Sequence, residues 1–277
     1  MTAIETYRAI VERANAQNAR LTVPFSPAFW DRMAAQFTMD PRRPMDANLS
    51  SVAELLRPED VLIDVGGGAG RVGLPLALAA RELVNVEPSA GMNEAFRASA
   101  AGAGITNARA VEADWLDDHD VRGDVSLVFN VTYFVSEIER FITKLVAASR
   151  RRVIIGVWSV PPPFQNAGLF EVLHEERQEP VAGHRELLAV LWEMGILPDV
   201  RVLPLPFALR GAPAIPQTRE EAVKFWVDQA RGRDRETAVA RLDARFDALF
   251  AVAADGIRPT WRPDCREMLI TWETAKA

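Results

Sequence analysis

The chain has 277 residues, 49% hydrophobic and 25% charged, so it can bury a core and is too apolar for a disordered protein. Its formal net charge of −6 argues against a general nucleic-acid binder, because such proteins need a basic face. The longest apolar run, Leu74–Ala80, is far shorter than the ~20 residues that span a bilayer. No secretory signal is visible at the N-terminus, and the single cysteine, Cys265, excludes an internal disulfide. We therefore expect a soluble, cytoplasmic protein without nucleic-acid or membrane partners.

Residues 1–50 mix helix and loop, and we expect them to form an N-terminal helical lid segment before an α/β domain over 51–277. In this domain short apolar strands alternate with helices, which predicts βαβ units in a doubly wound, mostly parallel sheet. Ser89 and Ser136 are the expected caps of two of the helices. The expected strands are 61–65, 83–87, 107–112, 125–129 and 153–158, and the first two helices are 71–81 and 89–101.

The alternation of short apolar strands and helices is less regular after Pro161. We expect helical insertions near 163–182 and 217–254, after the fifth and sixth strands, and a helix over 184–194. Residues 199–209 alternate like an edge strand, because prolines interrupt them. A last strand is expected over 266–272.

The strongest motif follows the first strand, where Asp64 precedes a run of glycines interrupted by one alanine. Glycine at alternate positions lets the backbone turn sharply and approach a ligand, because no Cβ is in the way. The next helix would present unpaired N–H groups and its positive dipole end to an anionic group. The glycines of this candidate ligand-binding turn are Gly66, Gly67, Gly68 and Gly70.

Acidic residues also follow the second and third strands, at Glu87 and Asp114. The carboxyl ends of the strands in an open α/β sheet meet at one crevice, so we expect both acids to converge on the glycine turn. A carboxylate after the second strand can accept both hydroxyls of a ribose. The simpler interpretations are a solvated turn for Glu87 and a solvated acidic loop for Asp114.

Over about residues 55–160 these motifs resemble those of class I S-adenosylmethionine-dependent methyltransferases. The family pattern of an acid followed by x-Gly-x-Gly-x-Gly is matched by Asp64 and the glycines at 66, 68 and 70. The resemblance implies S-adenosylmethionine as the cofactor and a seven-stranded sheet whose last strand is antiparallel. The insertions after the fifth strand depart from the minimal family pattern.

The resemblance also implies roles for the matching residues. Glu87 would bind the ribose, and Asp114 would hold the adenine amino group with Trp115 beside the ring. Asn130, at the end of the fourth strand, would lie next to the methionine moiety. The residues implied to contact the cofactor further include Pro88 or Met92 against the adenine, and Trp30 and Arg32 in an aromatic-Asp segment typical of small-molecule methyltransferases.

Other classes of protein stay open. Residues 68–73 match the G-x-G-x-x-G pattern of dinucleotide-binding oxidoreductases, but the strand ends two residues before that pattern begins, and Asp64 would repel a pyrophosphate. A second class is a catalytically inactive protein that binds S-adenosylmethionine or a nucleotide and acts through a partner. It would differ from an active methyltransferase in turnover and not in ligand affinity. An RNA methyltransferase is disfavoured by the acidic charge and because residues 130–133 read Asn-Val-Thr-Tyr rather than Asn-Pro-Pro-Tyr.

A sulfonium cofactor already activates its methyl group, so the protein mainly aligns an in-line attack and need not supply a catalytic residue. Histidine titrates near neutral pH, and His174 lies in the insertion expected over the crevice. Tyr133 follows the fourth strand. These two are the candidate catalytic residues, whereas His119 and His184 are more simply surface residues.

The sequence thus predicts a methyltransferase that acts on an oxygen or nitrogen nucleophile of a small molecule. The three histidines are far apart and the acids near Asp117 lack a ligand spacing, so no metal site is expected. The acceptor and the oligomeric state, a homodimer included, are left open.

Overall fold

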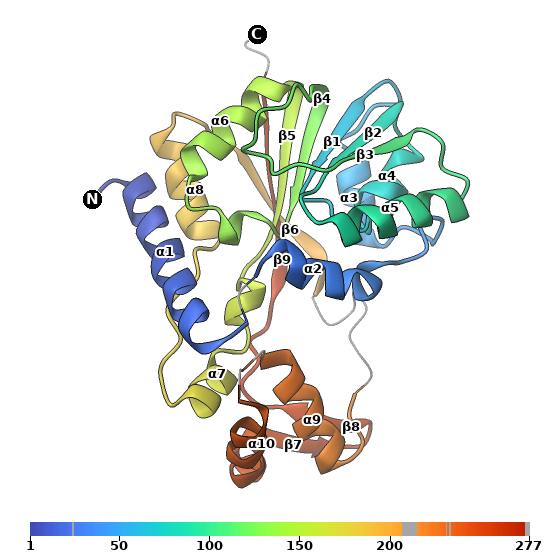
Figure 1. The fold of residues 1–277 in the computed structure, drawn as a ribbon. Helices are drawn as coiled ribbons and strands as arrows, with labels where there is room; N and C mark the ends of the chain where they lie inside the picture. The colour runs from blue at the N-terminus through green and yellow to red at the C-terminus, as the bar shows by residue number, and fades with distance from the viewer. Residues whose placement is uncertain (24, 207–214, 231, 233, 275–277) are drawn as a thin grey trace.

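A computed structural model of the chain describes every residue except 24, 207–214, 231, 233 and 275–277. Its centre is a seven-stranded sheet in the order β3-β2-β1-β4-β5-β9-β6, in which β9 is antiparallel to both of its neighbours (Figure 1). The predicted doubly wound, mostly parallel sheet with an antiparallel last strand is therefore confirmed. The strands are β1 (Val61–Val65), β2 (Glu82–Val86), β3 (Ala108–Val111), β4 (Gly123–Phe129), β5 (Ser149–Trp158), β6 (Asp199–Pro206) and β9 (Arg266–Glu273).

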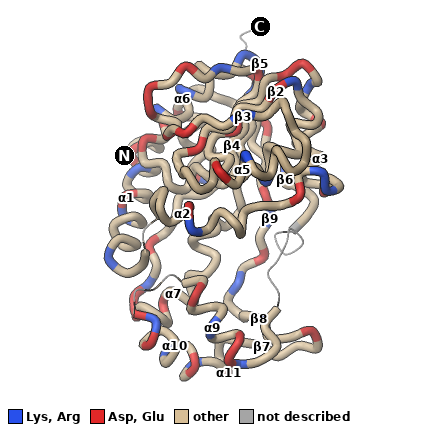
Figure 2. Tube along the Cα trace, turned by 45° about the vertical axis from the view of Figure 1, so that its right-hand side comes forward, with Lys and Arg blue, Asp and Glu red and all other residues tan. Residues whose placement is uncertain are grey.

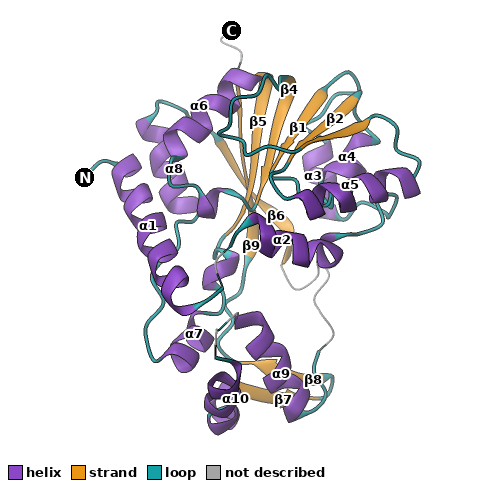
Figure 3. Cartoon of the chain, viewed as in Figure 1, coloured by secondary structure: helices purple, strands orange, loops and turns teal. Residues whose placement is uncertain are grey.

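Helices cover both faces of the sheet (Figure 3). One face packs against α1 (Ala3–Leu21), α6 (Ile138–Ala148) and α8 (His184–Glu193), and the other against α3 (Ala47–Ala53), α4 (Gly73–Ala77) and α5 (Ala90–Gly102). Strands buried on both faces are mostly apolar rather than alternating, as in β1, where all five residues are buried and Asp64 is the one polar residue. No described helix is both long and apolar enough to cross a membrane.

Several predicted boundaries differ from the structure; β5, for example, begins at Ser149, four residues before its predicted start. The helix expected over 71–81 ends at Ala77, because the amides of residues 78–80 bond to the third preceding carbonyl instead of the fourth. Ser136 does not cap α6, which begins after Glu137 without a side-chain cap. The edge strand ends at Pro206, and residues 207–209 of its predicted extent lie outside the described residues.

The segments in which insertions are expected form an appended group beyond the carboxyl edge of the sheet (Figure 1). Its helices pack around a separate apolar cluster that includes Leu169, Trp226 and Leu242. A two-stranded hairpin also belongs to this group, in a region where the sequence analysis expects helix. The sequence pattern did not reveal the hairpin, because Phe246 and Leu249 keep a helical spacing up to its first strand. The group consists of α7 (Ala167–His174), α9 (Arg219–Ala230), α10 (Arg235–Ala244), α11 (Phe246–Leu249), β7 (Phe250–Ala253) and β8 (Gly256–Pro259).

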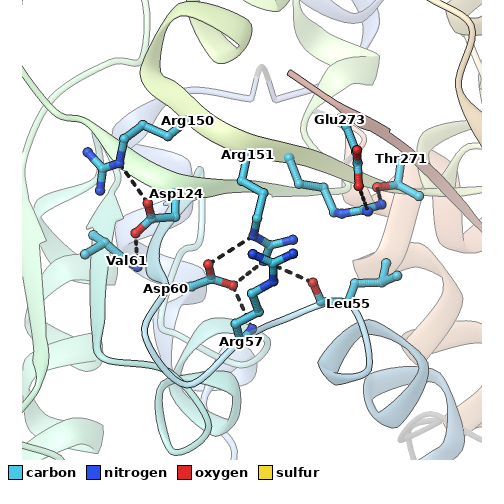
Figure 4. A network of polar contacts seen from close by, with 10 residues as sticks. Leu55, Arg57, Asp60, Val61, Asp124, Arg150, Arg151, Thr271 and Glu273 are labelled. Atoms are coloured by element: carbon cyan, nitrogen blue, oxygen red, sulfur yellow. Dashed lines mark hydrogen bonds and ion pairs between the residues drawn. The ribbon is translucent and has the colours of Figure 1, made fainter. Parts of the chain in front are cut away.

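A buried ion pair joins Asp60, directly before β1, to Arg151 near the start of β5 (Figure 4). The amino ends of these strands lie away from the appended group (Figure 1). The Asp60 carboxylate accepts hydrogen bonds from Nε of Arg151 at 3.1 Å, from Nη2 of Arg151, and from the amide of Arg57 at 2.7 Å. Its side chain is 3% exposed. The neighbouring Arg150 bonds Asp124 at 2.8 Å, but its side chain is 59% exposed. Of these two pairs, the one between Asp60 and Arg151 is thus shielded from solvent.

The two arginines provide a matched comparison of stability. Arg151→Gln leaves the Asp60 carboxylate buried without its charge partner, so we expect the free energy of unfolding to fall by about 3–5 kcal/mol. Arg150→Gln removes an exposed pair and should cost less than about 1 kcal/mol. Urea unfolding of both variants measures the difference. Equal losses would show that Asp60 does not depend on Arg151.

Candidate functional site

The turn after β1 has the sharp backbone path that its glycines predict. Gly66, Gly68 and Gly70 have φ values of 67°, 55° and 83°, in the left-handed region that favours glycine. A Cβ on Gly66 would lie 2.5 Å from Cγ2 of Val131, at the end of the neighbouring strand. The amide of Gly66 donates to the carbonyl of Val86 at 2.8 Å, which ties the turn to β2.

Asp64 lies beneath this turn rather than in contact with solvent. Its side chain is fully buried, and a Cβ on Gly67 would overlap both its carboxyl group and Oδ1 of Asn85. Burial, with the nearby charge of Glu87, raises the pKa of Asp64 to about 7. Asn85 also donates to the carbonyl of Gly68 at 3.1 Å. Two polar side chains from β1 and β2 therefore support the turn from below.

Glu87, directly after β2, holds the turn from the side. Its Oε2 accepts the amide of Gly68 at 3.1 Å, and its Oε1 accepts the amide of Ser89 at 2.9 Å. Burial raises the pKa of Glu87, although these two amides oppose the shift. An ionised carboxylate can accept about four hydrogen bonds, so two positions are left for a ligand. Glu87 is 6% exposed, so the structure contradicts the interpretation as a solvated turn.

One cavity of about 1440 Å³ lies at the carboxyl edge of the sheet and is lined by most of the predicted site residues. The helix α2 (Pro27–Met33), which carries Trp30, lies across this edge in Figure 1. The predicted residues that line the cavity are Trp30, Asp64, Gly66, Gly67, Gly68, Glu87, Pro88, Met92, Asp114, Trp115, Asn130 and Tyr133.

Three predicted residues do not line it. Gly70 faces the core, where its Cβ would lie 2.6 Å from Leu74. Arg32 is exposed on α2, while the preceding residue, Asp31, accepts hydrogen bonds from Ser89 and Gly91 at the start of α5. His174 ends α7 against Phe170, with ring centroids 4.4 Å apart, and α7 directs Phe170 instead of His174 to the cavity. The candidate base is therefore not brought to the site.

Tyr133 is a positioning residue in this structure. Its hydroxyl donates to Oδ1 of Asn130 at 3.1 Å and accepts the amide of Trp158 at 2.5 Å. Burial raises the pKa of Tyr133 well above its usual value near 10, so the phenol stays protonated at neutral pH and cannot serve there as a base. Asn130 has a positive φ of 62° and lies at the end of β4, where the sequence analysis places it.

Asp114 and Trp115 lie at the rim. Asp114 is exposed and its Oδ1 accepts the amide of Leu116 at 2.8 Å, so it faces solvent and cavity together. Trp115 is 4% exposed and belongs to the main core, with Nζ of Lys144 5.2 Å from its ring. It packs in the core while one side borders the cavity.

The sequence analysis missed two residues that connect the site to its surroundings. Asp31 accepts hydrogen bonds from the Ser89 hydroxyl at 2.7 Å and the Gly91 amide at 2.9 Å, and so attaches α2 to the start of α5. Asn85 could have been identified from the sequence, because it is a polar residue between apolar residues of β2. Asp31 carries no such signal, since its partners lie 58 and 60 residues away.

No family model matches the chain. It is 29% identical over 153 residues to the ribosomal RNA small subunit methyltransferase G of Mycobacterium leprae, a match that covers 54% of this chain. The chain spans about half the length of the curated relatives it matches, 56% in this case.

Solved structures resemble the fold over most of the chain. A SAM-dependent methyltransferase from Thiobacillus denitrificans, in complex with S-adenosyl-L-homocysteine, has a TM-score of 0.53 at 14% identity and covers 90% of this chain and 98% of its own. The YcgJ protein from Bacillus subtilis has a TM-score of 0.54 at 16% identity, covering 83% and 99%. The chain has the class I S-adenosylmethionine-dependent methyltransferase fold, as the motifs predict.

The pKa of Asp64 predicts how stability depends on pH. The folded protein retains this proton up to about pH 7, whereas an unfolded aspartate releases it near pH 4. Its contribution to the free energy of unfolding is present below pH 4 and is lost as pH rises to 7, at up to about 1.4 kcal/mol per pH unit. Asp64→Asn cannot titrate, so its stability relative to wild type should increase over this range. Urea unfolding from pH 4 to 8, with Asp118→Asn as the exposed control, tests this, and a constant difference would contradict it.

Variants at two neighbouring residues of α2, Asp31 and Arg32, test whether the hydrogen bonds of Asp31 hold this helix in place. Asp31→Asn weakens the bonds to Ser89 and Gly91, so we expect faster amide hydrogen exchange over residues 27–33. Arg32→Ala should leave exchange unchanged, because Arg32 is exposed and does not line the cavity. Exchange followed by mass spectrometry compares the two, and the reverse order would show that Asp31 does not hold α2.

Proposed function

We propose that this protein is an S-adenosylmethionine-dependent methyltransferase that transfers a methyl group to an oxygen or nitrogen nucleophile of a small molecule. The observation that carries the proposal is the position of Glu87. Its carboxylate lies between the amides of Gly68 and Ser89, on a cavity that the glycine turn also lines, in a class I methyltransferase fold.

The residues of the cavity fit this cofactor. The free acceptor positions of Glu87 suit the two hydroxyls of a ribose, and Met92 and Pro88 offer apolar surface beside it for an adenine. Asp114 at the rim can accept the adenine amino group. The glycine turn leaves room for a ligand backbone to approach, because any Cβ there would fill that room or collide with Asp64 and Val131.

When bound, the cofactor supplies a methyl group activated by its sulfonium. The chain contributes position and the exclusion of water, since α2 covers the cavity and Tyr133 orients Asn130. Neither candidate base can take a proton from the acceptor: Tyr133 stays protonated and His174 lies elsewhere. We therefore propose an acceptor whose nucleophile ionises readily by itself.

A small acceptor agrees with the enclosure and the charge of the site. Aromatic residues of the N-terminal segment border the cavity, which suits a covered ligand better than a folded macromolecule. Figure 2 shows acidic and basic positions interspersed along the described trace, and the net charge is −6. A ribosomal RNA acceptor is the second candidate, supported by the partial similarity to the Mycobacterium leprae enzyme.

Glu87→Gln tests the cofactor. It replaces a charged acceptor of ribose hydroxyls by a neutral amide, so the Kd for S-adenosylhomocysteine should rise about 10- to 100-fold. Glu94→Gln, an exposed change on the adjoining helix α5, should leave it unchanged. Calorimetric titration with S-adenosylhomocysteine, NAD and NADP measures this. Binding of NAD instead, or of no ligand, would contradict the proposal, and absence of turnover with intact binding would favour the inactive binding protein.

A further inference from the structure

The edge of the sheet at β6 carries an exposed apolar surface. Among the described strands of the sheet β6 is the outermost, with β9 as its neighbour. Val200 and Val202 of β6 are 44% and 56% exposed. Trp192, near the end of α8, and Leu197, in the connection from α8 to β6, are 58% and 83% exposed. These four residues form an edge patch, and exposed apolar residues gathered in this way typically mark an interaction surface.

The two valines lie on the face of the sheet that α8 covers at the neighbouring strand. Val200 pairs with Ile270 of β9, and Val202 pairs with Met268. Ile270 and Met268 pack in the same apolar cluster as the buried residues of α8. The helix therefore covers this face at β9, while the valines of β6 beside it stay exposed to solvent.

Prolines and one asparagine limit the part of the β6 edge on which another strand can pair. Pro198 and Pro204 have no amide hydrogen to donate. Beyond Pro204 the side chain of Asn48 already bonds the backbone of Leu205, donating to its carbonyl at 3.3 Å and accepting its amide at 2.8 Å. Residues 199–203 are the stretch between these limits. A pairing this short needs side-chain contacts to stabilise it.

The charges of this stretch are complementary to those of a second copy. Asp199 and Arg201 flank Val200 and, because strand side chains alternate, lie together on the opposite face. Two antiparallel copies related by a two-fold axis at Val200 place Asp199 of each copy across from Arg201 of the other. Opposite charges in this position stabilise a strand pair.

An existing contact of Arg201 is compatible with this pairing. Its Nη1 lies 3.8 Å from a carboxylate oxygen of Glu54 on α3, and both side chains are more than half exposed. Such a surface pair contributes little to stability. A guanidinium has five N–H donors, so Arg201 can bond a second carboxylate while it stays near Glu54.

We propose that two copies of this chain associate through β6, with the strands antiparallel and the two-fold axis at Val200. Val200 of each copy then meets Val200 of the other, and the edge patch adds apolar side chains beside the paired strands. Trp192 is the type of residue that is enriched in such interfaces. None of the described residues that line the cavity falls within 192–202, so the dimer does not depend on the proposed cofactor.

Sedimentation equilibrium of the full chain over a range of concentrations tests for the dimer. Wild type should dimerise, and Val200→Lys should weaken the dimer at least about tenfold, because it places two ammonium groups at the axis. Val252→Lys, at an exposed valine of β7, is the matched control and should dimerise as wild type does. A wild-type chain that stays monomeric even in its most concentrated samples, or a dimer that Val200→Lys does not weaken, refutes the proposal.

Charge reversal tests the position of the axis. Asp199→Arg faces Arg201 of the other copy with a second cation, and Arg201→Asp faces Asp199 with a second anion. Each variant alone should dimerise at least about tenfold more weakly than wild type. An equal mixture of the two should regain wild-type dimerisation, because each mixed pair again places an arginine across from an aspartate at both positions. Native mass spectrometry identifies this heterodimer by its mass.

The mixture gives a clear result in either direction. Heterodimers in excess of both homodimers support the axis at Val200 and show that both variants are folded. A mixture that dimerises no better than the separate variants contradicts this pairing, as do single variants that dimerise like wild type. Should one single variant not fold, the double variant Asp199→Arg/Arg201→Asp is compared with the other, and it should dimerise more tightly because it restores opposite charges across the axis.

Discussion

The buried carboxyl group of Asp64 and the glycine turn above it are packed so closely that a side chain on Gly67 has no space. From this contact a series of hydrogen bonds extends across the carboxyl edge of the sheet. The turn directs the amide of Gly68 to Glu87, Glu87 accepts the amide of Ser89, and the Ser89 hydroxyl donates to Asp31 on α2. The position of the helix that covers the cavity therefore depends on the shape of a turn after β1.

Stability and binding are divided between the two edges of the sheet. The amino edge carries the buried pair of Asp60 and Arg151, which joins β1 to β5 and touches no residue of the cavity lining. At the carboxyl edge, polar groups such as Asp64 are buried at a cost to stability, which is typical of functional sites. Most residues of the strands between the two edges are apolar, so each edge can carry polar groups for its own role.

The cofactor end was predictable because its residues follow consecutive strands. Parallel strands bring their carboxyl ends together, so Asp64, Glu87 and Asn130 could be assigned to one crevice from their sequence positions. The residues from the helices around the cavity were not predictable in this way. Arg32 was expected to contact the cofactor but is exposed, since sequence does not say which side of a seven-residue helix faces the cavity. His174 was placed over the crevice, but the helical turn of α7 points Phe170 there instead.

The sequence by itself determined the fold class and the chemistry of the glycine turn, because both arise from local patterns: strand periodicity, absent Cβ atoms, and acids at strand ends. Only the tertiary structure decided that Tyr133 orients Asn130, that Asp31 attaches α2 to the start of α5, and that Arg262 donates a hydrogen bond to Gln165 at the cavity wall. These contacts join residues whose pairing depends on how insertions pack against the sheet. Such packing is set by the shapes of whole surfaces, which no short stretch of sequence contains.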